Sequence, residues 1–361
     1  MLGQTPIGEN FKKKKLNDGL FDLNLQQCKK CGLCQIEDVI DPRILYKDYL
    51  YQSNSSNYLI KHFDNYSKQV SKFLKLEKKS LILDIGSNDG MLLSKFKKYG
   101  FKCLGIEPAK KIAKVANDRN IKTINSFFDN KTTNLILKKY KKISVVTANN
   151  VLANIDDIHS WFKNIKKIIT NEGFFVFESF YLRDVIKNKV LDFIYHEHLS
   201  IFSVKCIKYL CKLHDLKLIN VEAVNTKGGS LRYYVCSKNH RSKINNSIKK
   251  FEKLEYDSNC FKISTFKKLE QKIIQNKKEV NYLLTKIINT NYILGLGSSI
   301  SCITLMYFLD IQDKFKILLD DNKIKHGMFS PGTNIIVKNP KTFKYSSDQT
   351  IIILAWRFKK I

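Results

Sequence analysis

The chain lacks long apolar runs, and this absence limits where the protein can reside. Across 361 residues no stretch of about 18 consecutive apolar residues occurs, so no transmembrane helix is predicted. The first six residues, Met-Leu-Gly-Gln-Thr-Pro, also lack the basic and then apolar order of a signal peptide. We therefore expect a soluble, cytoplasmic protein with no membrane partner.

Arginine is scarce, although the chain is strongly basic. The net charge is +30, but only six of the 63 basic residues are arginine, and most lysines are interleaved with other residue types. Such lysines are typical of solvated helix faces, so nucleic acid is not the expected partner. A positive field nevertheless attracts anions of any kind, including a small substrate that carries phosphate.

The number and placement of the cysteines do not suit the disulfide framework of a secreted protein. The nine cysteines are an odd number, and most of them lie inside apolar segments. This distribution predicts reduced, buried thiols. The length allows two or three domains, each with its own core.

An apolar run that ends in a glycine-rich turn, residues 81–90, organises the sequence. It reads Leu-Ile-Leu-Asp-Ile-Gly-Ser-Asn-Asp-Gly, which predicts a buried strand followed by a turn into a helix. A second predicted strand, residues 103–106, ends in Glu107, an acid well placed to accept hydrogen bonds from a ribose. The turn lacks both the three-glycine dinucleotide spacing and a P-loop.

This pattern resembles the S-adenosylmethionine site of class I methyltransferases. In that family the glycine-rich turn passes beneath the methionine part of the cofactor, and the downstream acid holds the ribose. The matching positions are Asp84, Gly86, Gly90 and Glu107. The alternative is an ordinary strand, turn and helix without a ligand.

Strands and helices alternate between residue 80 and about residue 237, which predicts a sheet built from crossover units. We expect strands at residues 80–85, 102–106, 121–124, 143–148 and 173–179, with a late pair at 216–222 and 230–237. A helix should precede them at residues 58–76. The fold class is therefore α/β, with the seven-stranded Rossmann-like sheet of a class I methyltransferase.

Four regions follow from these patterns. They are a small N-terminal module resembling a zinc module at residues 1–70, a methyltransferase domain at 71–240, a helical connector at 241–288 and a second, small Rossmann-like domain at 289–361. In the last of these, Gly295-x-Gly297 follows a strand, and residues 316–319 and 350–355 are further strands. A lone Gly-x-Gly is weak evidence for a ligand.

The densest polar cluster of the chain lies at residues 195–200, Tyr-His-Glu-His-Leu-Ser, after the fifth strand. It should therefore lie at the carboxyl end of the sheet, where ligands bind. If the segment is extended, Tyr195 and Glu197 share one side, and His196 and His198 share the other. We interpret it as acid and base machinery, with a metal site or satisfied polar packing as alternatives.

The N-terminal module carries Cys28-x-x-Cys31-Gly, half of a zinc knuckle. Cys34 is the third nearby thiol, and no histidine lies in the first 60 residues, so a complete four-ligand site is not visible. Tyr49 and Tyr51 follow in a tyrosine-rich segment that either packs or faces a substrate.

Five stretches together resemble the sugar C-methyltransferases, which add a methyl group to a carbon of a nucleotide-linked keto-deoxysugar. They are residues 83–90, 105–109, 148–153, 195–200 and 228–232, in family order and spread over most of the chain. The last stretch, Gly-Gly-Ser-Leu-Arg, is also compatible with an ordinary hairpin turn. Members of the family carry two N-terminal Cys-x-x-Cys pairs, and this chain matches only the second pair. The chain also stops where a last helix and strand are expected.

The resemblance implies a role for each matched residue. His198, Glu197 and Tyr195 are the implied catalytic residues. The cofactor S-adenosylmethionine would be held by Asp84, Gly86, Ser87, Asn88, Gly90, Glu107, Pro108, Asn149 and Asn150. The sugar would be bound by Tyr49, Tyr51, His196, Gly229 and Arg232, and any zinc by Cys28 and Cys31.

The implied reaction begins when His198 removes the proton next to the sugar ketone, because a neutral imidazole is a suitable base near pH 7. Tyr195 and Glu197 would then stabilise the enolate oxygen. The remaining alternatives are an O-methyltransferase acting on a glycan or natural product, an inactive methyltransferase fold that only binds, and a nucleic-acid methyltransferase supported by charge alone. A monomer or homodimer is expected.

Overall fold

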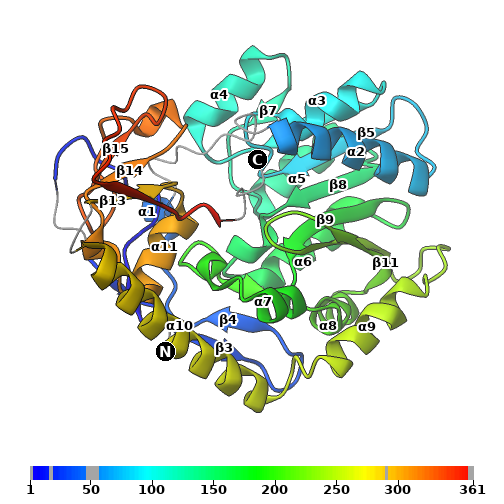
Figure 1. The fold of residues 1–361 in the computed structure, drawn as a ribbon. Helices are drawn as coiled ribbons and strands as arrows, with labels where there is room; N and C mark the ends of the chain where they lie inside the picture. Colours follow the sequence, from blue (N-terminus) through cyan, green and yellow to red (C-terminus); the bar gives the residue numbers. More distant parts are fainter. Residues whose placement is uncertain (1–2, 16–18, 46–56, 289–291, 357–361) are drawn as a thin grey trace.

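A computed structural model describes residues 3–15, 19–45, 57–288 and 292–356. Its centre is a seven-stranded sheet flanked by helices, with a smaller parallel sheet beside it (Figure 1). In the described part of the chain, no helix combines the length and the apolar character needed to cross a membrane.

The large sheet has the strand order β11-β12-β9-β8-β5-β6-β7. Its strands are β5 (Leu81–Ile85), β6 (Lys102–Ile106), β7 (Thr123–Ile124), β8 (Val145–Asn149), β9 (Phe174–Phe180), β11 (Leu216–Val224) and β12 (Ser230–Ser237). All neighbours pair in parallel except β12, which is antiparallel to both β9 and β11. This order, with one reversed strand near one edge, is that of class I methyltransferases and confirms the predicted fold class.

Both faces of the sheet are covered, which explains why β5 is buried along its whole length. One face packs against α2 (Asn57–Phe73), α3 (Met91–Lys98) and α4 (Lys110–Asp118). The other face packs against α5 (Asn130–Lys139), α6 (Ile158–Ile169) and α8 (Val204–Leu213). In α6, apolar residues recur every three or four positions, and the Asp157 side chain caps the helix by accepting from the Ser160 N–H.

The N-terminal residues form two small hairpins rather than a separate layer. β1 (Gln4–Thr5) pairs with β2 (Phe21–Asp22), β3 (Leu25–Gln27) pairs with β4 (Cys34–Ile36), and α1 spans Pro42–Leu45. β4 also pairs with β10 (Ser200–Ile201), the strand that directly follows the polar cluster. The N-terminal residues therefore help to position that cluster.

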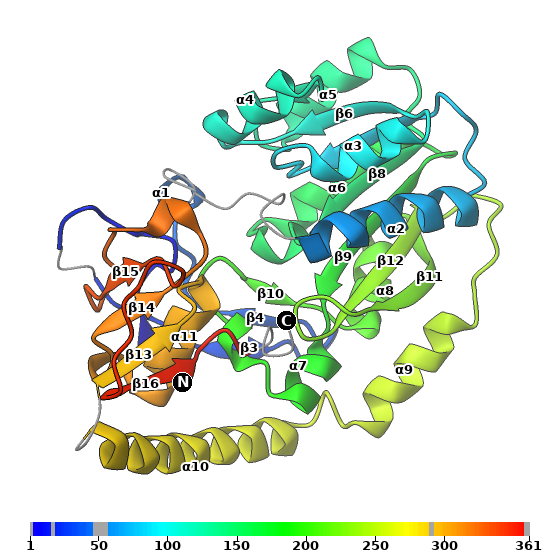
Figure 2. The ribbon, with the colours of Figure 1, turned by 45° about the horizontal axis from the view of Figure 1, so that its top comes forward.

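The connector consists of α9 (Ser247–Asp257) and the long α10 (Ile263–Ile288), which runs along the outside of the molecule (Figure 2). It leads to four parallel strands in the order β15-β14-β13-β16. They are β13 (Tyr292–Leu296), β14 (Ile317–Leu319), β15 (Ile336–Lys338) and β16 (Gln349–Ile353), and α11 (Ile300–Leu309) packs on them.

Two further elements follow β9 in the large domain. They are α7 (Leu182–Asn188) and a short 3₁₀ turn, Leu191–Phe193, that leads into the polar cluster. A backbone bridge between Lys12 and Phe329 joins the beginning of the chain to the small parallel sheet. Ile300 of α11 packs in one cluster with Phe193 and Tyr195, and β4 pairs with β10, so segments from three parts of the sequence meet around residues 191–201.

Candidate active site

The carboxyl ends of β5, β6 and β8 lie side by side and carry most of the predicted cofactor residues. Asp84 is buried at the end of β5, and its carboxylate accepts a 2.6 Å hydrogen bond from Thr147 Oγ1 on β8. Burial raises the pKa of Asp84 to about 7, although the Thr147 bond acts in the opposite direction. This acid is therefore poised between its two protonation states at neutral pH.

Glu107 fastens the glycine-rich turn to β6. One carboxylate oxygen accepts the Asn88 backbone N–H at 3.0 Å, and the other accepts the Ala109 backbone N–H at 2.9 Å. Burial raises the pKa of Glu107, and both backbone bonds counteract it. Each oxygen keeps a second lone pair, so the carboxylate can also accept the two hydroxyls of a ribose.

The turn itself needs glycine. Gly86 has φ +65°, and a Cβ there would lie 2.5 Å from Cγ2 of Val151, so alanine is excluded by both backbone and space. Gly90 has φ +77°, and Asn88 is also left-handed, with φ +51°. Asparagine tolerates this conformation better than most residues, which explains its place here.

Three buried polar atoms around this turn have no hydrogen-bond partner among the described residues: Ser87 Oγ, Asn149 Nδ2 and Asn150 Oδ1. Buried polar atoms are normally bonded, so their clustering indicates a ligand that supplies both donors and acceptors. Pro108, half-buried, follows Glu107 at the same edge. The residues present thus fit S-adenosylmethionine, the cofactor of this fold.

The polar cluster forms a turn and not an extended strand. The His198 N–H bonds the Tyr195 carbonyl at 2.8 Å, so the alternation expected for an extended segment does not apply. The turn brings the Tyr195 hydroxyl to 3.1 Å from His198 Nε2 and stacks the two rings with centroids 4.1 Å apart. Sequence reasoning placed these two side chains on opposite sides, and the structure places them together.

The His198 ring is fixed in one tautomer. Nδ1 lies 2.7 Å from the Phe193 carbonyl, which can only accept, so Nδ1 carries the proton. Nε2 is then the unprotonated nitrogen, and the Tyr195 hydroxyl donates to it. Burial, reinforced by the positive charge of Lys227, lowers the pKa of His198 well below its ordinary value.

His196 points the other way. Its Nε2 lies 3.1 Å from the Asp22 carbonyl in the N-terminal hairpin, and its ring meets Phe21 edge-on. These contacts attach the turn to the N-terminal residues. A direct role for His196 in binding the sugar stays a prediction.

Glu197 is buried inside the same turn. Its Oε1 has no hydrogen-bond partner among the described residues. Burial, and after it the negative charge of Glu9, raise the pKa of Glu197 to about 8, although the positive charges of Lys227 and Lys325 lower it. At neutral pH the side chain is therefore mainly a neutral carboxylic acid, which can donate a hydrogen bond.

The other predicted sugar-binding residues are placed differently. Arg232 is buried in β12, where its guanidinium bonds Glu178, Gln69 and Glu222 and lies 4.3 Å over the Tyr66 ring. A Cβ on Gly229 would lie 2.6 Å from Asp184, so packing alone requires this glycine. Tyr49 and Tyr51 lie outside the described residues.

The described residues do not complete a zinc site around Cys28 and Cys31, and zinc at these two thiols stays a prediction. Cys28 is exposed, Cys31 is buried, and hydrogen bonds from the Cys206 and Cys28 thiols lower the pKa of Cys31. Within the described part of the chain, no three His, Cys, Asp or Glu side chains are grouped to hold a metal ion. Gly32, with φ +76°, makes the tight turn of the Cys-x-x-Cys-Gly segment.

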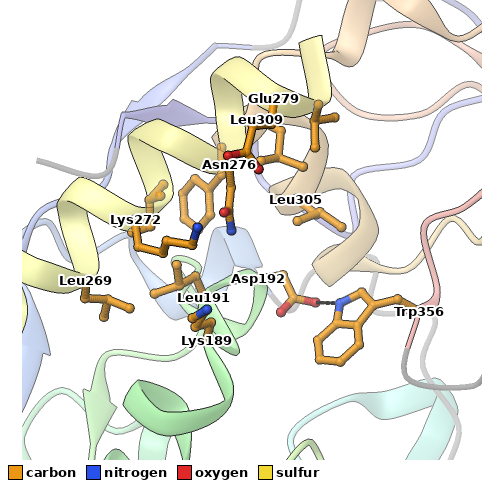
Figure 3. A pocket seen from close by; sticks show the side chains of 13 residues that line it. Lys189, Leu191, Asp192, Leu269, Lys272, Asn276, Glu279, Leu305, Leu309 and Trp356 are labelled. Carbon is orange, nitrogen blue, oxygen red and sulfur yellow. Dashed lines mark hydrogen bonds between the residues drawn. The ribbon is translucent and has the colours of Figure 1, made fainter. Parts of the chain in front are cut away.

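Two hollows lie away from these residues. A cavity of about 260 Å³ is enclosed by α10, α11 and residues 189–192, where Trp356 Nε1 donates to Asp192 at 3.2 Å (Figure 3). A larger hollow, of about 1270 Å³, lies at the amino ends of the strands, and nine of its 25 lining residues are lysine or arginine. Neither contains the Tyr195–His198 pair, so neither is the candidate active site.

Some functional contacts carried no recognisable signal in the sequence. Thr147, the Asp84 partner, is one residue of a buried apolar strand, and the Phe193 carbonyl belongs to the backbone. Glu9 and Lys325 act on Glu197 from opposite ends of the chain and belong to no motif. Only the three-dimensional fold brings them together.

Two family models match most of the chain. Residues 58–221 match the family described as "Methyltransferase domain", and residues 225–361 match "C-methyltransferase C-terminal domain". The C-methyltransferase NovU of Streptomyces niveus is 24% identical over 362 residues, covering 99% of this chain and 86% of that protein.

Solved structures match about half of the chain. The PH0226 protein of Pyrococcus horikoshii OT3 is 16% identical, with a TM-score of 0.41 over 54% of this chain and 98% of its own. An S-adenosylmethionine-dependent methyltransferase of Clostridium acetobutylicum is 14% identical, with a TM-score of 0.38 over 54% of this chain and 95% of its own.

Proposed function

Because the chain belongs to the S-adenosylmethionine-dependent C-methyltransferases, we propose that it methylates a carbon next to the keto group of a nucleotide-linked 4-keto-deoxysugar. The observation that carries the proposal is the buried His198 imidazole, with Nδ1–H held by the Phe193 carbonyl and Nε2 left as a base. A carbon becomes nucleophilic only after it loses a proton, whereas the alternative of O-methylation needs no ketone.

The cofactor is held by the chain at the ends of β5, β6 and β8. Glu107 would hold the ribose, and Ser87, Asn149 and Asn150, whose buried polar atoms have no partner among the described residues, would bond the remaining polar groups. Bound S-adenosylmethionine supplies an electrophilic methyl group on a positively charged sulfur. The protein's part is to hold the substrate carbon in line with that methyl group.

Proton removal is the task of His198. Nε2 accepts the proton from the carbon next to the ketone, and the bond from Nδ1 to Phe193 keeps the ring oriented while it becomes cationic. The Tyr195 hydroxyl, released from Nε2, turns to donate to the oxygen of the enolate. Glu197, neutral at pH 7, offers a second donor to the same oxygen.

The test uses a panel of nucleotide-linked 4-keto-deoxysugars with S-adenosylmethionine labelled in its methyl group. We expect the label on a ring carbon of at least one sugar, together with exchange of that carbon's proton in deuterated water. Label on a sugar oxygen, or transfer without any carbon-bound exchange, would contradict the proposal. The same reaction with O-acceptor glycans is the control for the alternative activity.

A further inference from the structure

The Glu9 side chain is 9% exposed and lies where the beginning of the chain meets the small parallel sheet. One carboxylate oxygen, Oε1, lies 3.2 Å from Nζ of Lys325. Lys325 is itself 4% exposed, also donates to the Ser298 carbonyl at 3.1 Å, and lies 4.2 Å over the Phe11 ring. The lysine ammonium group therefore contacts Oε1 of Glu9, the Ser298 carbonyl and the Phe11 ring.

The second oxygen of Glu9 is the unexplained atom. Oε2 is buried and has no hydrogen-bond partner among the described residues. Burial raises the pKa of Glu9, the charge and hydrogen bond of Lys325 lower it, and the negative charge of Asp320 raises it. A buried carboxylate oxygen normally accepts a hydrogen bond, which means that a donor from outside the described chain is missing here.

Glu197 in the candidate active site also has a carboxyl oxygen without a hydrogen-bond partner among the described residues. Its Oε1 is buried without a partner, and the charge of Glu9 acts directly on this carboxyl group. Of its neighbours in the turn, His196 bonds the Asp22 carbonyl and His198 bonds the Phe193 carbonyl. A Cβ on Gly8, the neighbour of Glu9, would lie 2.2 Å from Cγ2 of Ile300, and Ile300 packs in one cluster with Tyr195. Glu9 and Glu197, each with one unpartnered carboxyl oxygen among the described residues, therefore belong to the same region of the molecule.

We propose that Glu9 is a specificity-determining residue whose Oε2 accepts a hydrogen bond from a hydroxyl group of the sugar, beside the carbonyl bound by Glu197 and Tyr195. This inference rests on the proposed function and adds to it the N-terminal segment as part of the substrate site. Lys325 is a positioning residue, because it holds Oε1 and leaves Oε2 for the sugar.

The chemistry of the site favours a neutral hydroxyl over a cation. Lys325 already neutralises Glu9, so a second positive charge is not required. A metal ion would need several ligands, and the described residues contain no group of three suitable side chains. A hydroxyl satisfies one oxygen with one donor and adds no charge.

The experiment compares sugars in which each ring hydroxyl in turn is replaced by fluorine, which has similar size but cannot donate. Binding of each nucleotide-sugar is measured by calorimetry in the presence of S-adenosylhomocysteine, and KM and kcat are measured with S-adenosylmethionine. At one ring position, we expect the parent enzyme to bind the fluorinated sugar about 30-fold or more weakly than the sugar that carries the hydroxyl group. The effect should appear mainly in KM, because a site built for a donor rejects an analogue that lacks it.

In the Glu9→Gln variant, replacing the same sugar hydroxyl by fluorine should weaken binding by less than about threefold. The reason is that the amide turns its oxygen to Lys325 and its N–H groups toward the sugar. Glu9→Asp, which keeps the charge but shortens the reach, should also lose the discrimination. Glu37→Gln, an exposed acid of the same N-terminal region, is the matched control and should keep the parent's discrimination.

The inference is overturned if Glu9→Gln retains the parent's fluorine penalty, or if it weakens all sugars alike together with a lower melting temperature, as a mere tether would. The binding ratios do not require turnover. A parent enzyme that binds the sugars with this discrimination but does not methylate them would refute the proposed function and leave the role of Glu9 supported.

Discussion

Replacing His198 by asparagine removes one nitrogen of the imidazole and retains the other. The asparagine amide can still donate to the Phe193 carbonyl from the place of Nδ1, but nothing replaces Nε2, the atom 3.1 Å from the Tyr195 hydroxyl. Loss of that hydrogen bond and of the ring stacking should destabilise the fold by about 1–3 kcal/mol. Domains are typically stable by about 5–15 kcal/mol, so the variant should remain folded.

The catalytic effect should be larger than the structural one. Loss of a general base slows a reaction by about 10²- to 10⁴-fold, which corresponds to about 3–5 kcal/mol in the activation free energy. We therefore expect His198→Asn to bind S-adenosylmethionine as the parent does, to transfer methyl groups at this reduced rate and to lose exchange of the sugar's carbon-bound proton.

Three measurements decide the matter: cofactor affinity by calorimetry, methyl transfer with labelled cofactor, and proton exchange in deuterated water by NMR. His240→Asn is the control, since His240 lies at the other end of the sheet against Phe174. Exchange and turnover near the parent's level in His198→Asn would refute the assignment of the base. The next candidates would then be Tyr195 and the tyrosines at positions 49 and 51.

Three further outcomes are expected. Glu107→Ala should weaken S-adenosylmethionine binding by about 10- to 100-fold in calorimetry, because the ribose loses a charged acceptor; unchanged affinity would make the ribose assignment wrong. Purified protein should contain less than one zinc per chain by elemental analysis, and one equivalent lost on replacing Cys28 and Cys31 would contradict this. Asp84 and Glu197 should contribute a fall in thermal stability as the pH rises from about 4.5 through about 8, because they have pKa values of about 7 and about 8 in the folded state and bind more protons there than when unfolded. That slope should decrease in Glu197→Gln, and an unchanged slope would exclude Glu197 as its source.

The central sheet could be predicted from the sequence because its strands are buried on both faces and are bounded by clear turns. The predicted strands at 102–106 and 230–237 coincide with β6 and β12, and the others differ from the observed bounds by no more than two residues at either end. The connector was predicted to be helical and consists of α9 and α10. Short strands such as β15 carry too few residues for a periodic pattern, and it was missed.

The active site was predictable only in part. The Asp84 and Glu107 positions follow from strand ends, which local patterns reveal. The orientation of the turn at residues 195–198 depends on β4 and β10 pairing across the molecule, and no local pattern contains that information. The same holds for Glu9, whose partner Lys325 lies 316 positions later in the sequence.

The pairing of the first residues with late ones has a consequence for how the protein is made. Residue 12 leaves the ribosome long before its bridge partner at position 329, and at usual synthesis rates the delay is on the order of tens of seconds. The strands from residue 81 to residue 149 pair with one another and can form earlier. A nascent chain should therefore acquire the strands that carry its methyl-donor residues well before β4 can pair with β10 and residue 12 can pair with residue 329.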